Sequence, residues 1–253
     1  METRLALYSE LLERNGFPHG FFMRRGGVSV PPWESLNFST STGDSPDAVA
    51  ENLRRAAREL ALDASRIYYL SQVHGCDIEV LAGGEACADV TRRQGDITAT
   101  RATGVGCGVR MADCAAVLLA DRETCAVAAV HSGWRGTVRR ACASAVRQMH
   151  EWGARDLIAA VGPHIERCCF EVGEEVAVEL AGASSLGEDA VDRKRARPHV
   201  DLRGILAAQL HELGVAEVDH VAGCTVCDPE RFHSYRRDGP KSGRMLAVVA
   251  GRS

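Results

Sequence analysis

One cysteine and two histidines stand beside apolar segments of this chain and offer ligands for a metal ion. Cys114 precedes the apolar run 115–120, His131 ends a second such run, and His74 lies in the sequence Gln-Val-His-Gly. One thiolate and two imidazoles suit Zn²⁺ and leave one coordination position open for chemistry. Their spacing is not that of a compact zinc finger. A cysteine that fills the core and two locally bonded histidines therefore stay open as the alternative.

Two acidic residues are candidates for moving protons at such a site. Asp113 adjoins Cys114 at the end of an apolar run, where a carboxylate is costly to bury unless it is used. Asp96 begins another short strand-like segment. The candidate catalytic residues are therefore Cys114, His131, Asp113 and Asp96. Either acid would serve equally well by orienting a histidine ligand through a hydrogen bond.

The elements that must position these residues are predicted from periodicity and turn signals. Two buried strands near 114–120 and 125–130 are joined by the polar turn 121–124, which favours a hairpin over a parallel crossover. A helix is expected to start at Thr137 and run to about Trp152, because apolar residues recur there at helical spacing.

The rest of the chain reads as alternating strands and helices with no linker or repeat. We expect further helices over 45–60, 171–181 and 202–213, and a surface excursion over 182–198. Further strands are expected at 20–30 (broken by glycines), 67–70, 78–81, 96–100, 157–161, 218–222 and 245–250. The sequence thus predicts a single α/β domain over 1–253, layered and with mixed sheets.

Composition excludes several classes of function. The chain has 253 residues, 45% hydrophobic and 25% charged, with a net charge of −4, so nothing favours nucleic-acid binding. It contains no apolar run long enough to span a membrane, and its N-terminus carries charges where a signal peptide needs an apolar core. We therefore expect a cytoplasmic protein whose ten cysteines are reduced.

Several other residues carry weaker signals. Cys224-Thr-Val-Cys227 has CxxC spacing, but a single pair is weak evidence for zinc or redox chemistry. Cys168-Cys169 is expected to pack near the site, and His164 and His233 either enter a pocket or bond locally. The basic run 193–197 reads as a solvated loop.

A long series of short motifs resembles one known family. The chain resembles the YfiH/YlmD family, long labelled laccase-like polyphenol oxidases and now associated with purine nucleoside phosphorylase activity, from about residue 20 to 250. The motifs include Ser35-Leu-Asn37, Gln72-Val-His-Gly75, Ala112-Asp-Cys114, His131-Ser-Gly-Trp-Arg-Gly136, Gly162-Pro-His-Ile165, Phe170-Glu-Val-Gly173 and Ser234-Tyr-Arg-Arg-Asp238.

The resemblance implies zinc ligands at His74, Cys114 and His131. It implies phosphorolysis of adenosine, inosine, guanosine and methylthioadenosine, with adenosine deamination. Two positions depart from the family pattern: Leu53 stands where an arginine is common, and Ala116 where a proline is common. If the family arginine contacts phosphate, either Arg54 or Arg55 replaces it here or the contact is absent.

The implied reactions suggest further residues. In deamination, water activated at the zinc would attack C6 of adenine. In phosphorolysis, phosphate attacks C1′ of the ribose, and arginine holds phosphate through paired donors. Among the arginines, Arg135 is favoured because Gly136 and Thr137 are expected to begin a helix, whose first amides bind anions. The candidate substrate- and phosphate-binding residues are Arg24, Asn37, Arg135 and Arg236.

Three other functions remain open from the sequence. A copper polyphenol oxidase is disfavoured because multicopper centres use many histidines, often in His-x-His pairs, and this chain has nine histidines and no such pair. A cysteine hydrolase that edits peptidoglycan precursors would use Cys114 as nucleophile and His131 as base. A zinc-binding module without activity would need a fourth ligand.

Overall fold

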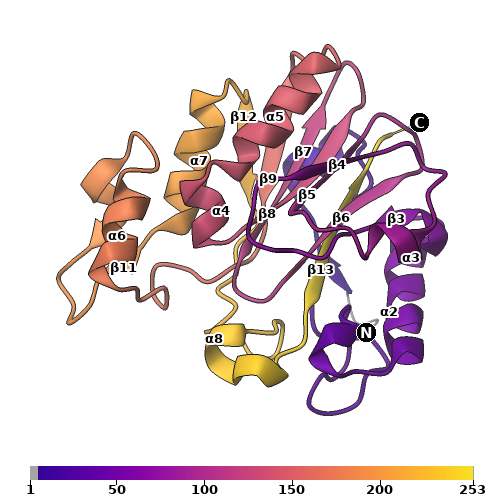
Figure 1. Ribbon diagram of the computed structural model, residues 1–253, viewed down its shortest axis with the longest axis horizontal. Helices are drawn as coiled ribbons and strands as arrows, with labels where there is room; N and C mark the ends of the chain where they lie inside the picture. The colour runs from indigo at the N-terminus through magenta and orange to yellow at the C-terminus, as the bar shows by residue number, and fades with distance from the viewer. Residues whose placement is uncertain (1–4, 253) are drawn as a thin grey trace.

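Two β-sheets pack face to face, and helices cover their outer faces, so the protein has four layers (Figure 1). The computed structural model describes residues 5–252. The layered α/β architecture with mixed sheets that the sequence predicts is confirmed. None of the helices formed within residues 5–252 has the length and apolar character needed to cross a membrane.

The six-stranded sheet carries most of the residues of interest. Its strands are, in spatial order, β12 (Glu217–His220), β9 (Leu157–Val161), β7 (Ala115–Asp121), β8 (Val127–Ser132), β5 (Ile97–Thr100) and β4 (Ile78–Leu81). The predicted hairpin is confirmed, since β7 and β8 pair antiparallel with Ala116 opposite His131. Both strands are buried along their whole length, which explains their nearly continuous apolar sequence.

Within residues 5–252 the second sheet has five strands, and the sequence did not reveal two of them, the short β1 and the central β6. The strands are, in spatial order, β1 (Ala6–Leu7), β2 (His19–Phe22), β13 (Met245–Ala250), β6 (Gly106–Met111) and β3 (Ile67–Tyr68). Of these two, β6 lies between β13 and β3 although its sequence contains two glycines and an arginine. A short third sheet pairs β10 (Val191–Asp192) with β11 (His199–Val200).

The helices divide between the two outer faces. Packed against the six-stranded sheet are α4 (Trp134–Val138), α5 (Ala141–Glu151), α6 (Glu174–Ala181) and α7 (Leu202–Glu212). The outer face of the other sheet is covered by α2 (Pro46–Glu59), whose predicted apolar face includes Ala56 and Ala57. The short helices are α1 (Glu10–Arg14), α3 (Cys87–Val90) and α8 (Tyr235–Asp238), with 3₁₀ turns at Thr40–Thr42, Ala64–Arg66, Gly187–Ala190 and Gly239–Lys241.

The helix predicted from Thr137 to Trp152 is wrong as one unbroken element. The chain instead forms the short helix α4, breaks at Arg140, which has a φ of 58°, and resumes as α5. The Arg140 guanidinium donates to the Glu212 carboxylate of α7 at 2.8 Å. Gly136 and Thr137 therefore lie inside α4 and do not begin a helix.

Other elements also have boundaries that differ from the predicted ones. The glycine-broken strand expected over 20–30 is only β2, and α6 begins at Glu174, three residues later than expected. The segment 182–198 is more than a surface excursion, because Ala190 and Val191 are buried among the helices that cover the six-stranded sheet.

Candidate metal centre and substrate pocket

The three residues predicted to bind zinc come together at one end of the β7–β8 hairpin. The ligand atoms of His74, Cys114 and His131 all lie within 4.8 Å of one another. The Cys114 Sγ is 3.9 Å from the His74 Nε2, and the two imidazole ring centroids are 5.0 Å apart. Cys114 stands just before β7, while His131 lies in β8, so strand pairing brings the two side chains to the same place.

Asp96 orients the His131 ring and holds the backbone turn that carries His74. One of its carboxylate oxygens is 2.7 Å from Nδ1 of His131, which directs Nε2 of that ring toward the other ligands. The same carboxylate accepts backbone N–H bonds from Val73, His74 and Gly75 and thereby shapes the turn that carries His74. Burial opposes ionisation of Asp96, but these bonds prevail and lower its pKa to about 2.

The centre favours a thiolate at Cys114. Burial opposes ionisation of this thiol, but the positive charge and the hydrogen bonds of His131 and His74 lower its pKa to about 6. Burial likewise opposes protonation of His131, yet the Cys114 thiolate and Asp96 raise its pKa to about 9. A thiolate is the form of cysteine that binds metals, and a metal displaces the imidazolium proton.

The backbone at the site adopts conformations that ordinary residues avoid. His74 has a φ of 60° and Asp113 a φ of 89°, both in the left-handed region. Hydrogen bonds hold each in place, since the Asp113 carbonyl accepts from the Ile165 N–H at 2.9 Å. Gly133 passes so close that a Cβ there would lie 2.6 Å from the Cys114 sulfur. Only glycine at this position leaves the ligands room.

The second candidate acid, Asp113, holds two loops together. Its carboxylate accepts bonds from the Thr225 hydroxyl and the Arg236 backbone N–H, both at 2.6 Å. Asp113 also lines the cavity beside the metal centre. Asp96 and Asp113 thus both make hydrogen bonds that hold neighbouring segments in place. Their roles in proton transfer stay predictions.

A cavity of about 640 Å³ opens beside the three ligands. This volume is within the range of sites that bind small organic ligands. Its wall combines apolar and aromatic side chains with cationic ones. The lining includes Gln72, Arg110, Met111, Trp134, Ile165, Phe170, Leu202, Tyr235, Arg236 and Arg244.

Three arginines line this cavity, and only one of them was a sequence candidate. Arg236 donates to the carbonyls of Cys169 and Glu171. Arg244 follows the last quoted motif by six residues and was not singled out, and Arg110 was missed. The signal for Arg110 was an arginine within the apolar stretch 105–111. Nη1 of Arg110 donates to Ser39 at 3.2 Å and Nη2 donates to the Leu70 carbonyl.

The other predicted binding residues do not line the cavity. Arg135 is exposed, with its guanidinium 4.3 Å from the centroid of the Trp134 ring. Asn37 is buried and accepts the Arg244 backbone N–H at 2.7 Å, so it supports a cavity residue from behind. Arg24 donates to the carbonyls of Glu34 and Pro229.

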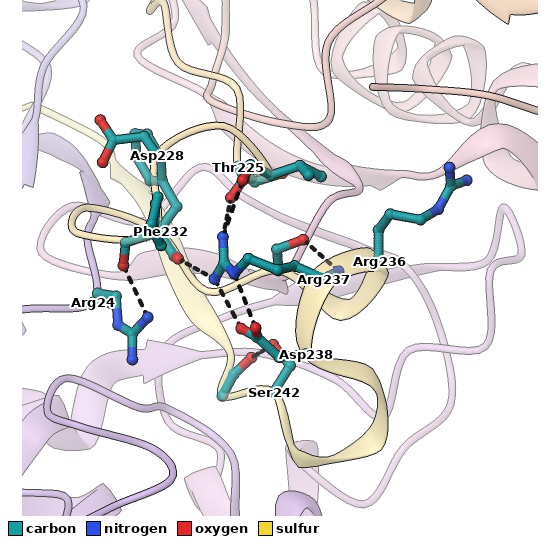
Figure 2. Close-up of polar contacts among 12 residues, drawn as sticks. Arg24, Thr225, Asp228, Phe232, Arg236, Arg237, Asp238 and Ser242 are labelled. Atoms are coloured by element: carbon teal, nitrogen blue, oxygen red, sulfur yellow. Dashed lines mark hydrogen bonds and ion pairs between the residues drawn. The ribbon is translucent and has the colours of Figure 1, made fainter. Parts of the chain in front are cut away.

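Arg237 organises the segment that bears Arg236. As Figure 2 shows, its guanidinium lies between the Thr225 and Phe232 carbonyls and the Asp238 carboxylate. The Arg236 side chain extends away from it (Figure 2). One arginine of the Tyr-Arg-Arg sequence thus holds the loop, and the other faces the cavity.

Comparison with known proteins agrees with this geometry. Residues 18–252 match the family model described as multi-copper polyphenol oxidoreductase laccase. A Deinococcus radiodurans protein named purine nucleoside phosphorylase is 40% identical over 235 residues, covering 92% of this chain and 88% of the relative. The chain belongs to the YfiH/YlmD family.

Solved structures of the family share the fold. YlmD from Geobacillus stearothermophilus superposes with a TM-score of 0.86 at 30% identity, covering 94% of this chain and 93% of that one. The Bacillus licheniformis hypothetical protein YfiH gives a TM-score of 0.91 at 25% identity, covering 100% and 98%. Of the two departures from the family pattern, Leu53 packs into the apolar cluster under α2, and Ala116 pairs with His131 in the hairpin.

Proposed function

We propose that this protein is a zinc-dependent purine nucleoside phosphorylase that acts on adenosine, inosine, guanosine and methylthioadenosine and also deaminates adenosine. One observation carries the proposal: a His–Cys–His ligand set borders a cavity lined by arginines and aromatic rings. The names of the relatives support the phosphorylase activity. The substrates would be purine nucleosides and inorganic phosphate.

The ligand set fits zinc. Two imidazoles and one thiolate within 4.8 Å match a catalytic zinc site with three protein ligands, and Asp96 provides the carboxylate that commonly orients a zinc-binding histidine. When bound, zinc supplies a Lewis acid with one coordination position open to water or substrate. His74, Cys114 and His131 would hold it.

Arg244 and Arg236 are suited to bind phosphate. Within residues 5–252, the Arg244 guanidinium donates only through Nη1, to the carbonyls of Ser242 and Gly243, so its other N–H groups are available to an anion. Arg244 lines the same cavity as Cys114 and Asp113. Two arginines at this wall would hold phosphate against the developing positive charge on the ribose.

The aromatic side chains would hold the purine. Trp134, Phe170 and Tyr235 line the cavity, and flat rings stack favourably on nucleobases. Stacking distinguishes purines poorly, in keeping with a range of purine nucleosides as substrates.

The test is phosphate-dependent release of base from inosine and adenosine, with ribose 1-phosphate as product, by protein of measured metal content. We expect activity that a chelator removes and zinc restores. The His74→Ala variant should lose it, whereas a matched control, His211→Ala, alters an exposed histidine on α7 and should keep it. Activity that survives both chelation and loss of His74 would refute the zinc mechanism, and copper as the stoichiometric metal would favour an oxidase.

A second candidate, a cysteine hydrolase, has its own supporting observation. Cys114 with its lowered pKa, His131 and Asp96 form the series of nucleophile, base and orienting carboxylate that such enzymes use. Peptidoglycan precursors were its expected substrates. Hydrolysis that needs no phosphate, resists chelators and stops when Cys114 is alkylated would establish this function instead.

A further inference from the structure

Four cysteines from two distant segments gather outside the centre described above. Cys168 and Cys169 lie in the loop between β9 and α6, and Cys224 and Cys227 lie between β12 and α8. Their four sulfur atoms all lie within 4.8 Å of one another. The first pair was expected only to pack near the site, and the second was weak evidence as a lone CxxC pair. The fold joins them into one group.

The distances between the sulfur atoms suit a shared metal ion. Cys227 Sγ is 3.3 Å from Cys169 Sγ and 3.6 Å from Cys168 Sγ. A tetrahedral zinc with Zn–S bonds of about 2.3 Å separates its sulfurs by roughly 3.8 Å. The measured separations are close to that value and well beyond a disulfide bond of about 2.05 Å.

We propose that Cys168, Cys169, Cys224 and Cys227 bind a second Zn²⁺ in a closed structural site. Four sulfur ligands complete the tetrahedral coordination of zinc and leave no position for a substrate. Soft thiolates also select zinc over the hard cations that prefer oxygen. Binding requires no oxidant, because the thiols release their protons to solvent as the metal–sulfur bonds form.

The contacts around the cluster show what such a metal would hold. Between the second pair of cysteines, Thr225 donates its hydroxyl to Asp113 and its N–H to the His164 carbonyl. Beside the first pair, the Cys169 carbonyl accepts from Arg236, which lines the cavity. A zinc ion would therefore cross-link the loop that gives Ile165 and Phe170 to the cavity wall and the loop that leads into α8, whose Arg236 also lines the cavity. None of the four cysteines lines the cavity itself.

The cationic side chains around the cluster favour a tetrathiolate at this place. Such a centre carries two negative charges in excess of the zinc ion, and cationic side chains nearby offset them. The Arg195 guanidinium donates to the Cys168 carbonyl at 3.1 Å, and that of Arg236 reaches the Cys169 carbonyl at 3.2 Å. Arg237 holds the Thr225 and Val226 carbonyls between the other two cysteines (Figure 2).

The decisive experiment counts metal in a protein that lacks the first centre, so it does not depend on the proposed function. In the double variant His74→Ala, Cys114→Ser, we expect one zinc per chain by elemental analysis. Adding Cys224→Ser should remove it, whereas adding Cys87→Ser, a cysteine outside both groups, should not. A double variant that is folded and free of metal would overturn the proposal, as would zinc that persists after Cys224→Ser.

A second measurement uses the unaltered protein in case these variants do not fold. Cys168 and Cys227 are exposed, so as free thiols they would react readily with iodoacetamide. We expect zinc to protect all four cysteines from alkylation under native conditions, and a chelator to remove the protection. Equal labelling with and without chelator, or a disulfide among the four found by peptide mass, would refute the site.

Discussion

The two cysteine-containing clusters differ in how the chain prepares them. His74, Cys114 and His131 stand at the end of a buried hairpin, and Asp96 bonds to the His131 ring and to the backbone N–H of His74. The four cysteines lie on two loops, and two of them are exposed to solvent. Strand pairing and a buried carboxylate position the first set. The four sulfurs are also gathered within 4.8 Å, but on loops that the proposed zinc ion would hold together.

The donor atoms explain why the two clusters would serve different purposes. Three protein ligands beside a cavity leave zinc a free position, which chemistry requires, while four sulfurs close the coordination sphere. The contrast teaches that a metal centre's role depends on what the fourth position faces. Here one cluster faces the cavity, and the other holds the cavity wall.

The largest effect should come from His131→Ala. This change removes a ligand and leaves the buried Asp96 carboxylate without its imidazole partner. We expect phosphorolysis to fall more than about 100-fold, since a metal ion contributes several kcal/mol and each 1.36 kcal/mol is a factor of ten. Steady-state rates and zinc content measure the loss. The cysteine cluster should keep its zinc, and loss of both ions would show that the two centres are not independent.

Asp96→Asn should weaken the first centre and spare the second. The amide retains the shape but neither the charge nor the full set of acceptors that orient His131 and the turn 73–75. Outer-shell changes of this kind cost roughly 10- to 100-fold in metal affinity or activity. Competition with a chromophoric chelator measures the affinity. The control is Asp189→Asn at an exposed position, and an unchanged affinity in Asp96→Asn would contradict the orienting role.

Arg244→Ala should raise the KM for phosphate about tenfold or more. A hydrogen bond to a charged group is worth about 1.5–3 kcal/mol, and every 1.4 kcal/mol is tenfold. The comparison variant is Arg135→Ala, because Arg135 lies on Trp134 rather than along the cavity. The Arg135→Ala change should raise the KM for phosphate less than the Arg244→Ala change. A larger effect at Arg135 would restore the sequence-based prediction that this residue holds phosphate.

Acid should weaken zinc binding at the first centre. Between pH 9 and pH 6 we expect the zinc affinity to fall about tenfold for each pH unit. The pKa of His131 is raised to about 9 and that of Cys114 is lowered to about 6. In this window the metal must displace one proton, from His131, so affinity rises with pH and levels off above 9. Below pH 6 the thiol also protonates and the dependence steepens. Chelator competition across pH, in the chain with Cys224→Ser, isolates this centre.

The smallest effect should follow Cys227→Ser. Loss of a structural zinc would loosen the loop whose Cys169 carbonyl holds Arg236, so we expect KM to rise about three- to tenfold with little change in kcat. The midpoint of thermal unfolding should also fall. A kcat reduced as strongly as in His131→Ala would mean that the cluster takes part in the chemistry. The wild-type-like control is Cys87→Ser.

Local features of the sequence were predicted well where one periodicity dominates. The hairpin of β7 and β8, the helix α2 and the strands at 157–161 and 245–250 follow from apolar patterns within single segments. Prediction failed where long-range contacts prevail. The glycine-containing β6 is a strand because β13 and β3 pair with it. Neither partner is near in sequence.

By itself, the sequence determined the family, the layered α/β class and the three residues that meet at the first centre. Motifs and hydrophobic periodicity lie within short continuous segments, so they can be recognised without the fold. Only the tertiary structure decided that Asp96 orients His131, that Arg110 and Arg244 line the cavity, and that two separate cysteine pairs form one cluster. Those relations join segments distant in the chain. They are fixed by sheet pairing and packing, which no local pattern encodes.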